Sequence, residues 1–236
     1  MITTMRKSVT ETQQPANGGE TLASIVYNKL LEDILRGDLE PGRKLRLQAL
    51  KEQYEVGHSP LREALNRLSA NGMVVREENK GFRVSPASLE ELMELVRTRC
   101  WLEEIALRES IRHGDDRWEE RVVLAYHRLS RAPRPADERS FNTNTEWGVF
   151  HRRYHLALIS ACNSSLLLGY CAQLHEQALR YRNLTAVVAY RKRHETDEHE
   201  AIRDAALDRD ADLAVELLTA HFKVTADIVM SSGALT

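Results

Sequence analysis

Residues 55–65 of the chain read Glu-Val-Gly-His-Ser-Pro-Leu-Arg-Glu-Ala-Leu, and they carry the sharpest structural signal in the sequence. Leu61, Leu65 and Leu68 recur at helical spacing and form an apolar stripe that can bury against preceding helices. Ser59 suits an N-cap and Pro60 the first helical position, where its missing N–H is not needed. The pattern predicts a helix from Ser59-Pro60 to about Asn71 that turns these polar side chains outward: His58, Ser59, Arg62, Asn66 and Arg67.

Arg62 falls in the first turn of this expected helix, where the helix dipole disfavours a cation. A phosphate or a guanine edge at that end would supply the missing anion, and recognition helices meet DNA with their N-terminal residues. An ion pair with Glu63 or Glu32 on a solvated surface explains Arg62 equally well for an isolated helix. The residues by themselves leave both interpretations open.

Two helices and a hairpin are expected around this segment. Apolar residues at helical spacing predict a helix over residues 21–37, and a shorter one covers Leu47–Tyr54. Residues 73–76 and 82–85 are β-prone and separated by a polar turn, which is typical of a hairpin. We therefore predict a winged helix-turn-helix over residues 21–85, preceded by a disordered polar tail over residues 1–20.

After residue 86 the sequence changes to long amphipathic helices separated by short polar breaks. We expect them at about 88–113, 115–131, 138–161, 164–185, 188–208 and 210–230, and no strand-like alternation occurs among them. The predicted fold class is thus mostly α, with an all-α bundle of six or seven helices over residues 86–236.

Composition is that of an ordinary soluble globular protein. The chain has 236 residues, 42% hydrophobic and 29% charged, with a mean hydropathy of -0.45. The net charge of the chain is -2, but residues 22–85 carry 11 Lys and Arg against 9 Asp and Glu, so this segment has a small positive charge.

Three cysteines without a CxxC spacing argue against a disulfide scaffold or a thiolate zinc site, so we expect a reducing cytoplasm. No leader and no run of about 18 apolar residues is present, which argues against a membrane location.

Four of the nine histidines belong to helical apolar patterns in the second domain. His151 and His155 are four residues apart, so their rings share one helix face, while His199 and His221 lie on the two last expected helices. Buried imidazoles need partners, and a bound metal is one solution. Each histidine taken alone is better explained by an ordinary buried or surface position. A HExxH metalloprotease motif is not present, because His194 and His199 are five residues apart.

The order of these elements resembles the DNA-binding domain of the GntR superfamily. The resemblance is carried by Leu-Leu-Glu-Asp-Ile-Leu-Arg-Gly at 30–37, Leu-Glu-Pro-Gly-Arg-Lys-Leu at 39–45, Ser-Pro-Leu-Arg-Glu-Ala-Leu at 59–65 and Gly-Phe-Arg-Val at 81–84. The helical remainder is similar to the FCD effector domain of the FadR-type branch, so the resemblance covers residues 21–230. It implies a homodimeric, ligand-responsive transcription factor that binds double-stranded operator DNA.

The resemblance also implies which residues reach DNA. His58, Ser59, Pro60 and Arg62 match the start of the recognition helix. Lys80 and Gly81 match the wing tip, and Arg46 and Gln48 begin the helix-turn-helix. One departure is visible, since Gly57-His58 stands where the family usually has Ser-Arg, and this puts the operator sequence in doubt.

For the second domain, the resemblance implies a divalent metal held by an Asp-x3-His pair and two further histidines. His155, His199 and His221 match the three histidines, whereas His151 takes the place of the usual aspartate. Four imidazoles or three can then bind the metal, and either set suits Zn²⁺ or Ni²⁺ better than Mg²⁺ or Ca²⁺.

The implied effector is a small carboxylate, bound by the metal and by an arginine. Arg99 matches a family arginine that points into the cavity, and Arg180 and Arg182 are further candidates. The Trp147 to His155 segment and Arg180-Tyr-Arg look most like the glutarate-sensing, CsiR-like members, which indicates a dicarboxylate. We therefore expect a repressor that its effector releases from DNA. The alternative is a metal-dependent hydrolytic enzyme with an appended nucleic-acid module, which is disfavoured because no residue at recognisable spacing is left as general base.

Overall fold

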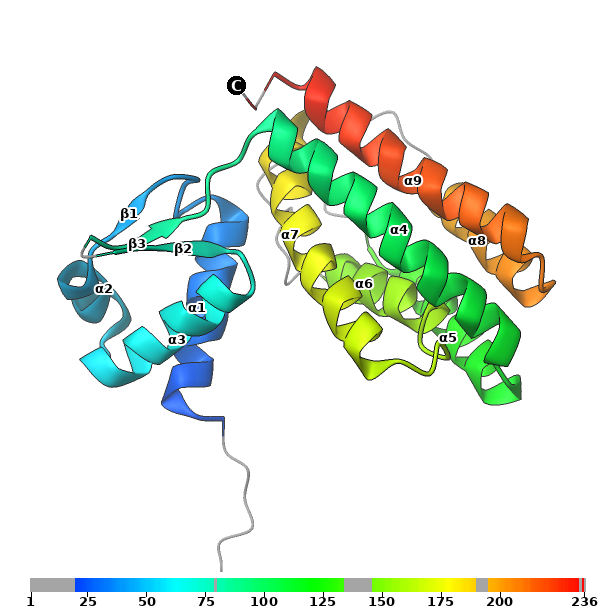
Figure 1. Cartoon of the computed structure of the whole chain (residues 1–236), viewed down its shortest axis with the longest axis horizontal. Coiled ribbons are helices and arrows are strands. Elements are labelled where there is room, and N and C mark those ends of the chain that lie inside the picture. Colours follow the sequence, from blue (N-terminus) through cyan, green and yellow to red (C-terminus); the bar gives the residue numbers. More distant parts are fainter. Residues whose placement is uncertain (1–19, 79, 134–145, 190–194, 234, 236) are drawn as a thin grey trace, which may run out of the picture.

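The computed structural model describes residues 20–78, 80–133, 146–189, 195–233 and 235. Figure 1 shows two lobes joined by the short segment between β3 and α4. The predicted tail lies outside the described residues except for Glu20, whose Oε1 accepts a hydrogen bond from Asn28 Nδ2 at 2.6 Å. The smaller lobe comes from the described residues up to Val84, and the larger one from the described residues that follow.

The smaller lobe packs three helices against a three-stranded sheet. Its elements are α1 (Leu22–Arg36), β1 (Lys44–Leu45), α2 (Leu47–Tyr54), α3 (His58–Ala70), β2 (Val74–Glu77) and β3 (Gly81–Val84). The leucine stripe of α3 is buried, as expected, and forms one core with Val26, Leu30 and Ile34 of α1. Thr21 caps α1 by accepting from Ser24 N, and Gly37 ends the helix in the left-handed conformation that glycine adopts without strain.

The sheet has one strand more than the sequence predicted. Its order is β1-β3-β2 and both pairings are antiparallel, with Lys44 opposite Arg83 and Val75 also opposite Arg83. Strand β1 has only two residues, so its sequence shows no alternation to detect. These two residues form a strand because they pair with β3, which lies about forty residues further along the chain.

Helix α3 begins earlier than the sequence indicated. Gly57 is the N-cap without a side-chain hydrogen bond, His58 is the first helical residue and Pro60 is the third. Pro60 is tolerated there because the first turn of a helix leaves its N–H groups unpaired in any case. The expectation of a Ser59 N-cap with Pro60 at the first position was therefore wrong by two residues, and Arg62 is the fifth residue of the helix.

The larger lobe is helical throughout its described part. Its helices are α4 (Leu89–His113), α5 (Asp116–Arg131), α6 (Glu146–Leu158), α7 (Ser165–Ala189), α8 (Glu195–Leu207) and α9 (Ala211–Ser231). The break expected after residue 185 was wrong, because α7 continues to Ala189 and α8 starts only at Glu195. Part of the expected 138–161 helix lies outside the described residues. Among the described helices, none is long and apolar enough to cross a membrane.

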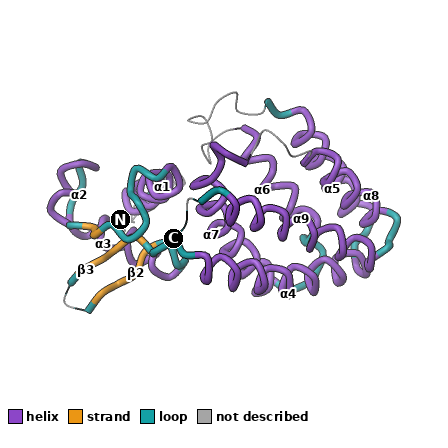
Figure 2. The backbone as a smooth tube through the Cα atoms, turned by 90° about the horizontal axis from the view of Figure 1, so that it is seen from above, coloured by secondary structure: helices purple, strands orange, loops and turns teal. Residues whose placement is uncertain are grey.

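Helix α7 lies between the two lobes (Figures 1 and 2). Gln173 Nε2 donates to Ala70 O at 3.1 Å, Gln177 Nε2 to Asn71 O at 2.9 Å and Asn183 Nδ2 to Leu35 O at 3.0 Å. These carbonyls stand at the C-terminal ends of α1 and α3, where a helix leaves its last C=O groups without internal partners. Side chains of α7 thus satisfy the ends of two helices in the smaller lobe and hold the lobes together.

Candidate metal centre

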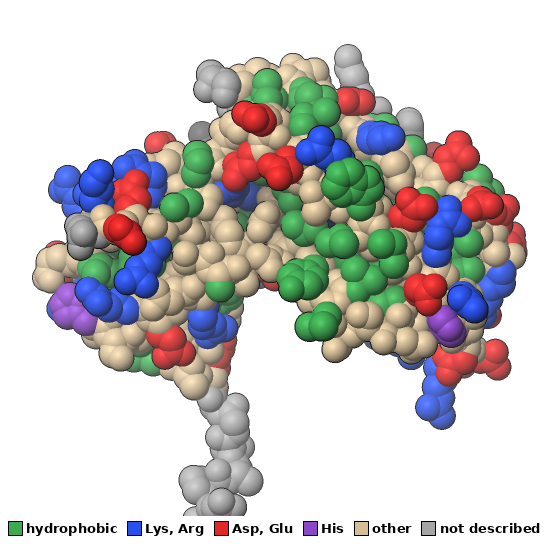
Figure 3. Space-filling view, in the orientation of Figure 1, with side chains coloured by type: hydrophobic (Ala, Val, Ile, Leu, Met, Phe, Trp, Pro, Cys, Tyr) green, Lys and Arg blue, Asp and Glu red, His purple; other side chains and the backbone are tan. Residues whose placement is uncertain are grey.

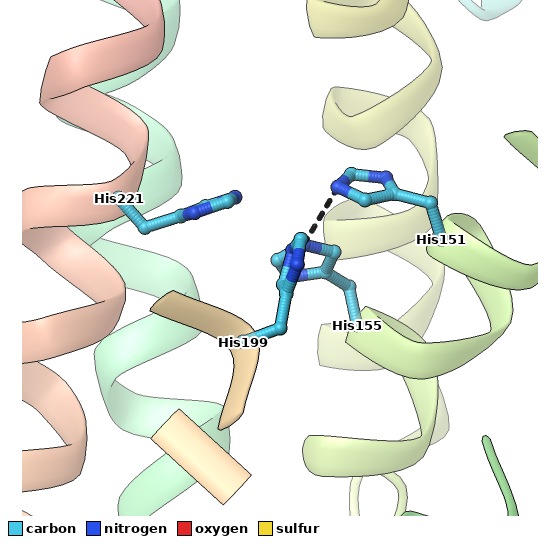
Figure 4. A group of neighbouring side chains, drawn as sticks. All are labelled: His151, His155, His199 and His221. Atoms are coloured by element: carbon cyan, nitrogen blue, oxygen red, sulfur yellow. Dashed lines mark hydrogen bonds between the residues drawn. The ribbon is translucent and has the colours of Figure 1, made fainter. Parts of the chain in front are cut away.

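Four histidine side chains meet in the interior of the helical lobe (Figure 4). His151 and His155 come from α6, His199 from α8 and His221 from α9. Each offers one ring nitrogen, and these four atoms all lie within 4.8 Å of one another. All four side chains are buried, the most exposed being His151 at 6%. The fold thus brings together the four histidines that the sequence singled out.

Neighbouring aromatic residues fix the orientation of α6. His151 and His155 lie one turn apart on this helix, with ring centroids separated by 4.5 Å. The buried Tyr154 hydroxyl donates to the backbone carbonyl oxygen of His199 at 2.7 Å and ties α6 to α8. The Trp147 indole stacks on the His151 ring at 4.7 Å between centroids. The imidazoles are therefore positioned by contacts among protein groups.

Hydrogen bonds assign a tautomer to most of these rings. His221 Nδ1 lies 2.7 Å from Glu198 Oε2, so this nitrogen donates to the carboxylate and Nε2 faces the cluster. Arg182 Nη1 lies 3.2 Å from His151 Nδ1, which must accept because a guanidinium only donates. His151 Nε2 then donates to His155 Nε2 at 3.2 Å, and the buried His155 Nδ1 has no hydrogen-bond partner.

The protonation state of the cluster suits metal binding. Burial lowers the pKa of His151 and of His155 well below the ordinary value, and the positive Arg182 lowers that of His151 further. Neutral imidazoles are the form that binds metal ions. An unpartnered buried nitrogen is also costly unless something compensates it. The donor set therefore fits a divalent transition metal, which accepts imidazole nitrogen readily.

A small cavity adjoins the histidines. Its volume is about 30 Å³, and its lining residues are Arg99, His151, His155, His175, Ala178, Leu179, Arg182, His221, Phe222 and Thr225. This space is large enough for an ion or a water molecule. Four of its lining residues (His175, Ala178, Leu179 and Arg182) belong to α7.

Arg99 is held at the cavity wall by a buried ion pair. Its Nε donates to Glu103 Oε1 at 2.9 Å, and Nη2 lies 2.8 Å from the same oxygen without hydrogen-bond geometry. Its guanidinium carbon stands 3.9 Å from the ring centroid of Phe222. Burial raises the pKa of the Glu103 carboxyl, while Arg99 opposes that shift. Arg99 thus lines the cavity with its charge largely balanced.

The three arginines expected to bind the effector do not all line the cavity. Arg99 and Arg182 line the cavity, but Arg180 does not belong to its described lining. Arg180 instead donates to the backbone carbonyls of Ser85 and Pro86 at 3.0 and 2.8 Å. Two residues along a helix correspond to a rotation of about 200°, so Arg180 and Arg182 face opposite sides of α7. We therefore correct the expectation for Arg180, which holds the connection between the lobes.

His175 is a cavity residue that sequence reasoning missed. It is buried, its ring centroid lies 5.8 Å from those of His151 and His155, and burial lowers its pKa well below the ordinary value. It does not belong to the four-nitrogen group. A signal existed in the sequence, because His175 and Arg182 are seven residues apart on one helix and so share a face.

The residues expected to contact DNA lie at the surface of the smaller lobe. Arg46, Gln48, His58, Ser59, Arg62 and Lys80 are exposed, while Pro60 and Gly81 are half-buried. Arg62 makes no ion pair with any described residue, so the solvated pairing with Glu63 or Glu32 is not observed. Gly81 has φ +92 and an open surrounding, which allows the backbone to approach a ligand closely at the wing. Figure 3 shows Lys, Arg and His side chains gathered at this end of the molecule.

The winged helix-turn-helix defines a DNA-binding protein, and the helical lobe joined to it carries the histidine cluster. The profile "Bacterial regulatory proteins, gntR family" matches residues 22–84, and "FCD domain" matches residues 94–224. The chain belongs to the GntR family of transcriptional regulators and carries an FCD effector-binding domain. FCD domains are often metal-binding, in agreement with the histidine cluster.

Relatives of known sequence share this architecture over almost their whole length. The chain is 38% identical to the HTH-type transcriptional regulator BphR of Paraburkholderia xenovorans, over 94% of this chain and 90% of BphR. It is 33% identical to the HTH-type transcriptional repressor GlaR of Escherichia coli, over 88% and 96% of the two chains. The crystal structure of a GntR regulator from Rhodococcus has the same fold, with a TM-score of 0.68 at 20% identity over 89% and 98%.

Proposed function

We propose that this protein is a homodimeric cytoplasmic repressor that leaves its operator when a small carboxylate binds at the metal centre. The observation that carries the proposal is the position of α7, which lines the cavity on one face and bonds to the DNA-binding lobe on another. The repressor GlaR, 33% identical to this chain, supports repression rather than activation of transcription.

His155, His199 and His221 would hold the metal, with Zn²⁺ or Ni²⁺ as the expected ion, because their nitrogens converge and are buried. His151 joins them once its Nδ1 is protonated, and Arg182 must then turn away, because two donors cannot face each other. When bound, the metal supplies a Lewis-acidic site for one carboxylate oxygen. Arg182, released from His151, is placed to take another carboxylate oxygen.

The charges around the cavity favour a dianion. Glu103 balances Arg99, and a bound divalent cation would add two positive charges to a cavity whose described lining contains no other carboxylate. A dicarboxylate neutralises this excess better than a monocarboxylate does, since opposite charges attract strongly where water is excluded. We therefore propose a short dicarboxylate as the effector.

On DNA, each winged helix-turn-helix would occupy one half-site of a near-palindromic operator. His58, Ser59, Pro60 and Arg62 would enter the major groove, Lys80 and Gly81 would reach the minor groove, and Arg46 and Gln48 would contact phosphate. The exposed positions of most of these residues support this assignment. We also propose domain boundaries at residues 21–85 and 86–236, which agree with the change from sheet and short helices to long helices.

The test combines metal analysis with two binding measurements on the full chain. Protein loaded with Zn²⁺ or Ni²⁺ is screened with short mono- and dicarboxylates in a thermal-shift assay, because a ligand that binds the native state raises the melting temperature. Active compounds are then titrated against protein bound to a DNA site selected from a random pool. The proposal expects stabilisation and release of DNA, and an active ligand that tightens DNA binding would overturn the repressor mechanism.

A further inference from the structure

Helix α4 has an outward face that combines apolar side chains with charged ones. Met93, Trp101 and Ile105 are 51%, 59% and 52% exposed on this helix. Arg97 lies in the same row and stacks on Trp101, with 5.5 Å between its guanidinium carbon and the ring centroid. Single exposed apolar residues are ordinary, but such a row on one helix is typical of an interaction surface. Figure 3 shows hydrophobic side chains gathered on the helical lobe in the view that places α4 in front.

The charges on this face change sign along the helix. Glu90 and Glu94 lie in its first half and Arg108 and Arg112 in its second half, and the helical period places all four on the same face as Trp101. Within the described chain, Glu90, Glu94, Arg97 and Arg112 form no ion pair. Arg108 contacts Glu104 and Asp212 at 3.0 and 2.6 Å.

The positions are symmetric about Trp101. Glu90 and Arg112 lie eleven residues to either side of it, and Glu94 and Arg108 lie seven residues to either side. An antiparallel copy of this helix would therefore place each glutamate opposite an arginine. A parallel copy would place like charges together, which opposes association. The face is thus complementary to itself in one orientation only.

We infer that a second copy of this chain packs on this face, with the two α4 helices antiparallel and Trp101 at the two-fold axis. Such an interface uses the same patch on both subunits, so Glu90 meets Arg112 of the partner subunit and Arg112 meets the partner's Glu90. The helices must cross at a shallow angle of about 20°, because a steeper crossing separates the outer pairs. The inference rests on the dimer in the proposed function and adds its surface, register and orientation.

This assignment connects the dimer to the cavity. Arg99 and Glu103 are buried on the opposite face of the same helix, and Arg99 lines the cavity. A ligand that shifts Arg99 would act on α4 between the cavity and the subunit interface. The distance between the two DNA-binding lobes can therefore change without either lobe unfolding.

The first experiment measures mass by sedimentation velocity over a concentration series. Trp101→Glu places two like charges at the axis and should weaken the dimer at least about 100-fold, as expected for juxtaposed like charges. Val123→Glu is the matched control, since Val123 is 48% exposed on α5, and it should remain dimeric. Both positions are exposed, so both variants should keep the wild-type melting temperature and circular dichroism.

A charge exchange tests the register. Glu90→Arg alone and Arg112→Glu alone should each weaken the dimer about fivefold, because each removes two symmetric surface pairs. The double variant re-forms these pairs with reversed sign and should return to within about threefold of wild type. Absence of rescue, or a Trp101→Glu protein that stays dimeric, overturns this surface. If the Trp101→Glu protein stays dimeric and still releases DNA with the effector, the proposed function stands without this surface. If the wild-type protein is monomeric, both the dimer of the proposed function and this surface are overturned.

Discussion

The guanidinium of Arg180 donates from Nη1 to the backbone carbonyl oxygen of Ser85 at 3.0 Å, and this bond joins the middle of α7 to the end of the wing. Its Nη2 reaches Pro86 O at 2.8 Å, so one side chain holds two successive carbonyls of the segment between the lobes. Arg180 is 3% exposed. Through Arg180, α7, which lines the cavity with its other face, is joined directly to the segment that follows the wing.

Arg180→Met should uncouple ligand from DNA. Methionine keeps an apolar stem but removes the hydrogen bonds to Ser85 O and Pro86 O and the ion pair with Glu91, so the end of the wing would lose its direct connection to α7. We expect metal content and effector affinity within about threefold of wild type, with the effector-induced loss of DNA affinity reduced at least about tenfold. Fluorescence anisotropy with labelled DNA, with and without effector, measures this. A variant that still releases DNA as wild type does would contradict a role for Arg180 in coupling.

His155→Ala should remove the metal. His155 lies at the centre of the cluster, and loss of one imidazole leaves two or three donors, which hold a transition metal far more weakly. Elemental analysis should fall from about one metal per chain to less than about 0.1, and EDTA should lower the melting temperature of wild type but not of the variant. His127→Ala, at an exposed position on α5, is the control and should keep its metal.

His175→Leu should separate effector binding from metal binding. His175 lines the cavity but lies outside the four-nitrogen group, and leucine is of similar volume and cannot hydrogen bond. We expect wild-type metal content together with at least about tenfold weaker effector binding by calorimetry, equal to about 1.4 kcal/mol. Loss of the metal in this variant would show that His175 is a ligand instead.

Arg62→Ala should weaken operator binding and leave effector binding unchanged. Arg62 is exposed on α3 and has no ion-pair partner among the described residues, so its removal breaks no ion pair in that part of the chain. A contact to a base edge is worth about 1–3 kcal/mol, and a contact to phosphate also reduces the salt dependence of binding. Gel-shift titrations at several salt concentrations measure both effects. Arg117→Ala on α5 should bind DNA as wild type does.

Local sequence patterns predicted much of this fold. The leucine stripe of α3, the glycine that ends α1 and the hairpin around Gly81 are signals within a few residues, and the structure confirms the mostly helical fold with its winged helix-turn-helix. Where the local signal was weak, the observed boundary differs from the predicted one: α3 begins at His58, and α7 continues to Ala189. Capping and periodicity act over one or two turns, so they determine the type of an element better than its ends.

The sequence by itself determined that His151 and His155 share a helix face, and that the residues around them are apolar enough to be buried. Only the tertiary structure decided that His175 lines the same cavity and that Arg180 points to Ser85. The reason is physical. A helix specifies its own faces through its 3.6-residue period, but which faces meet depends on packing among segments distant in the chain.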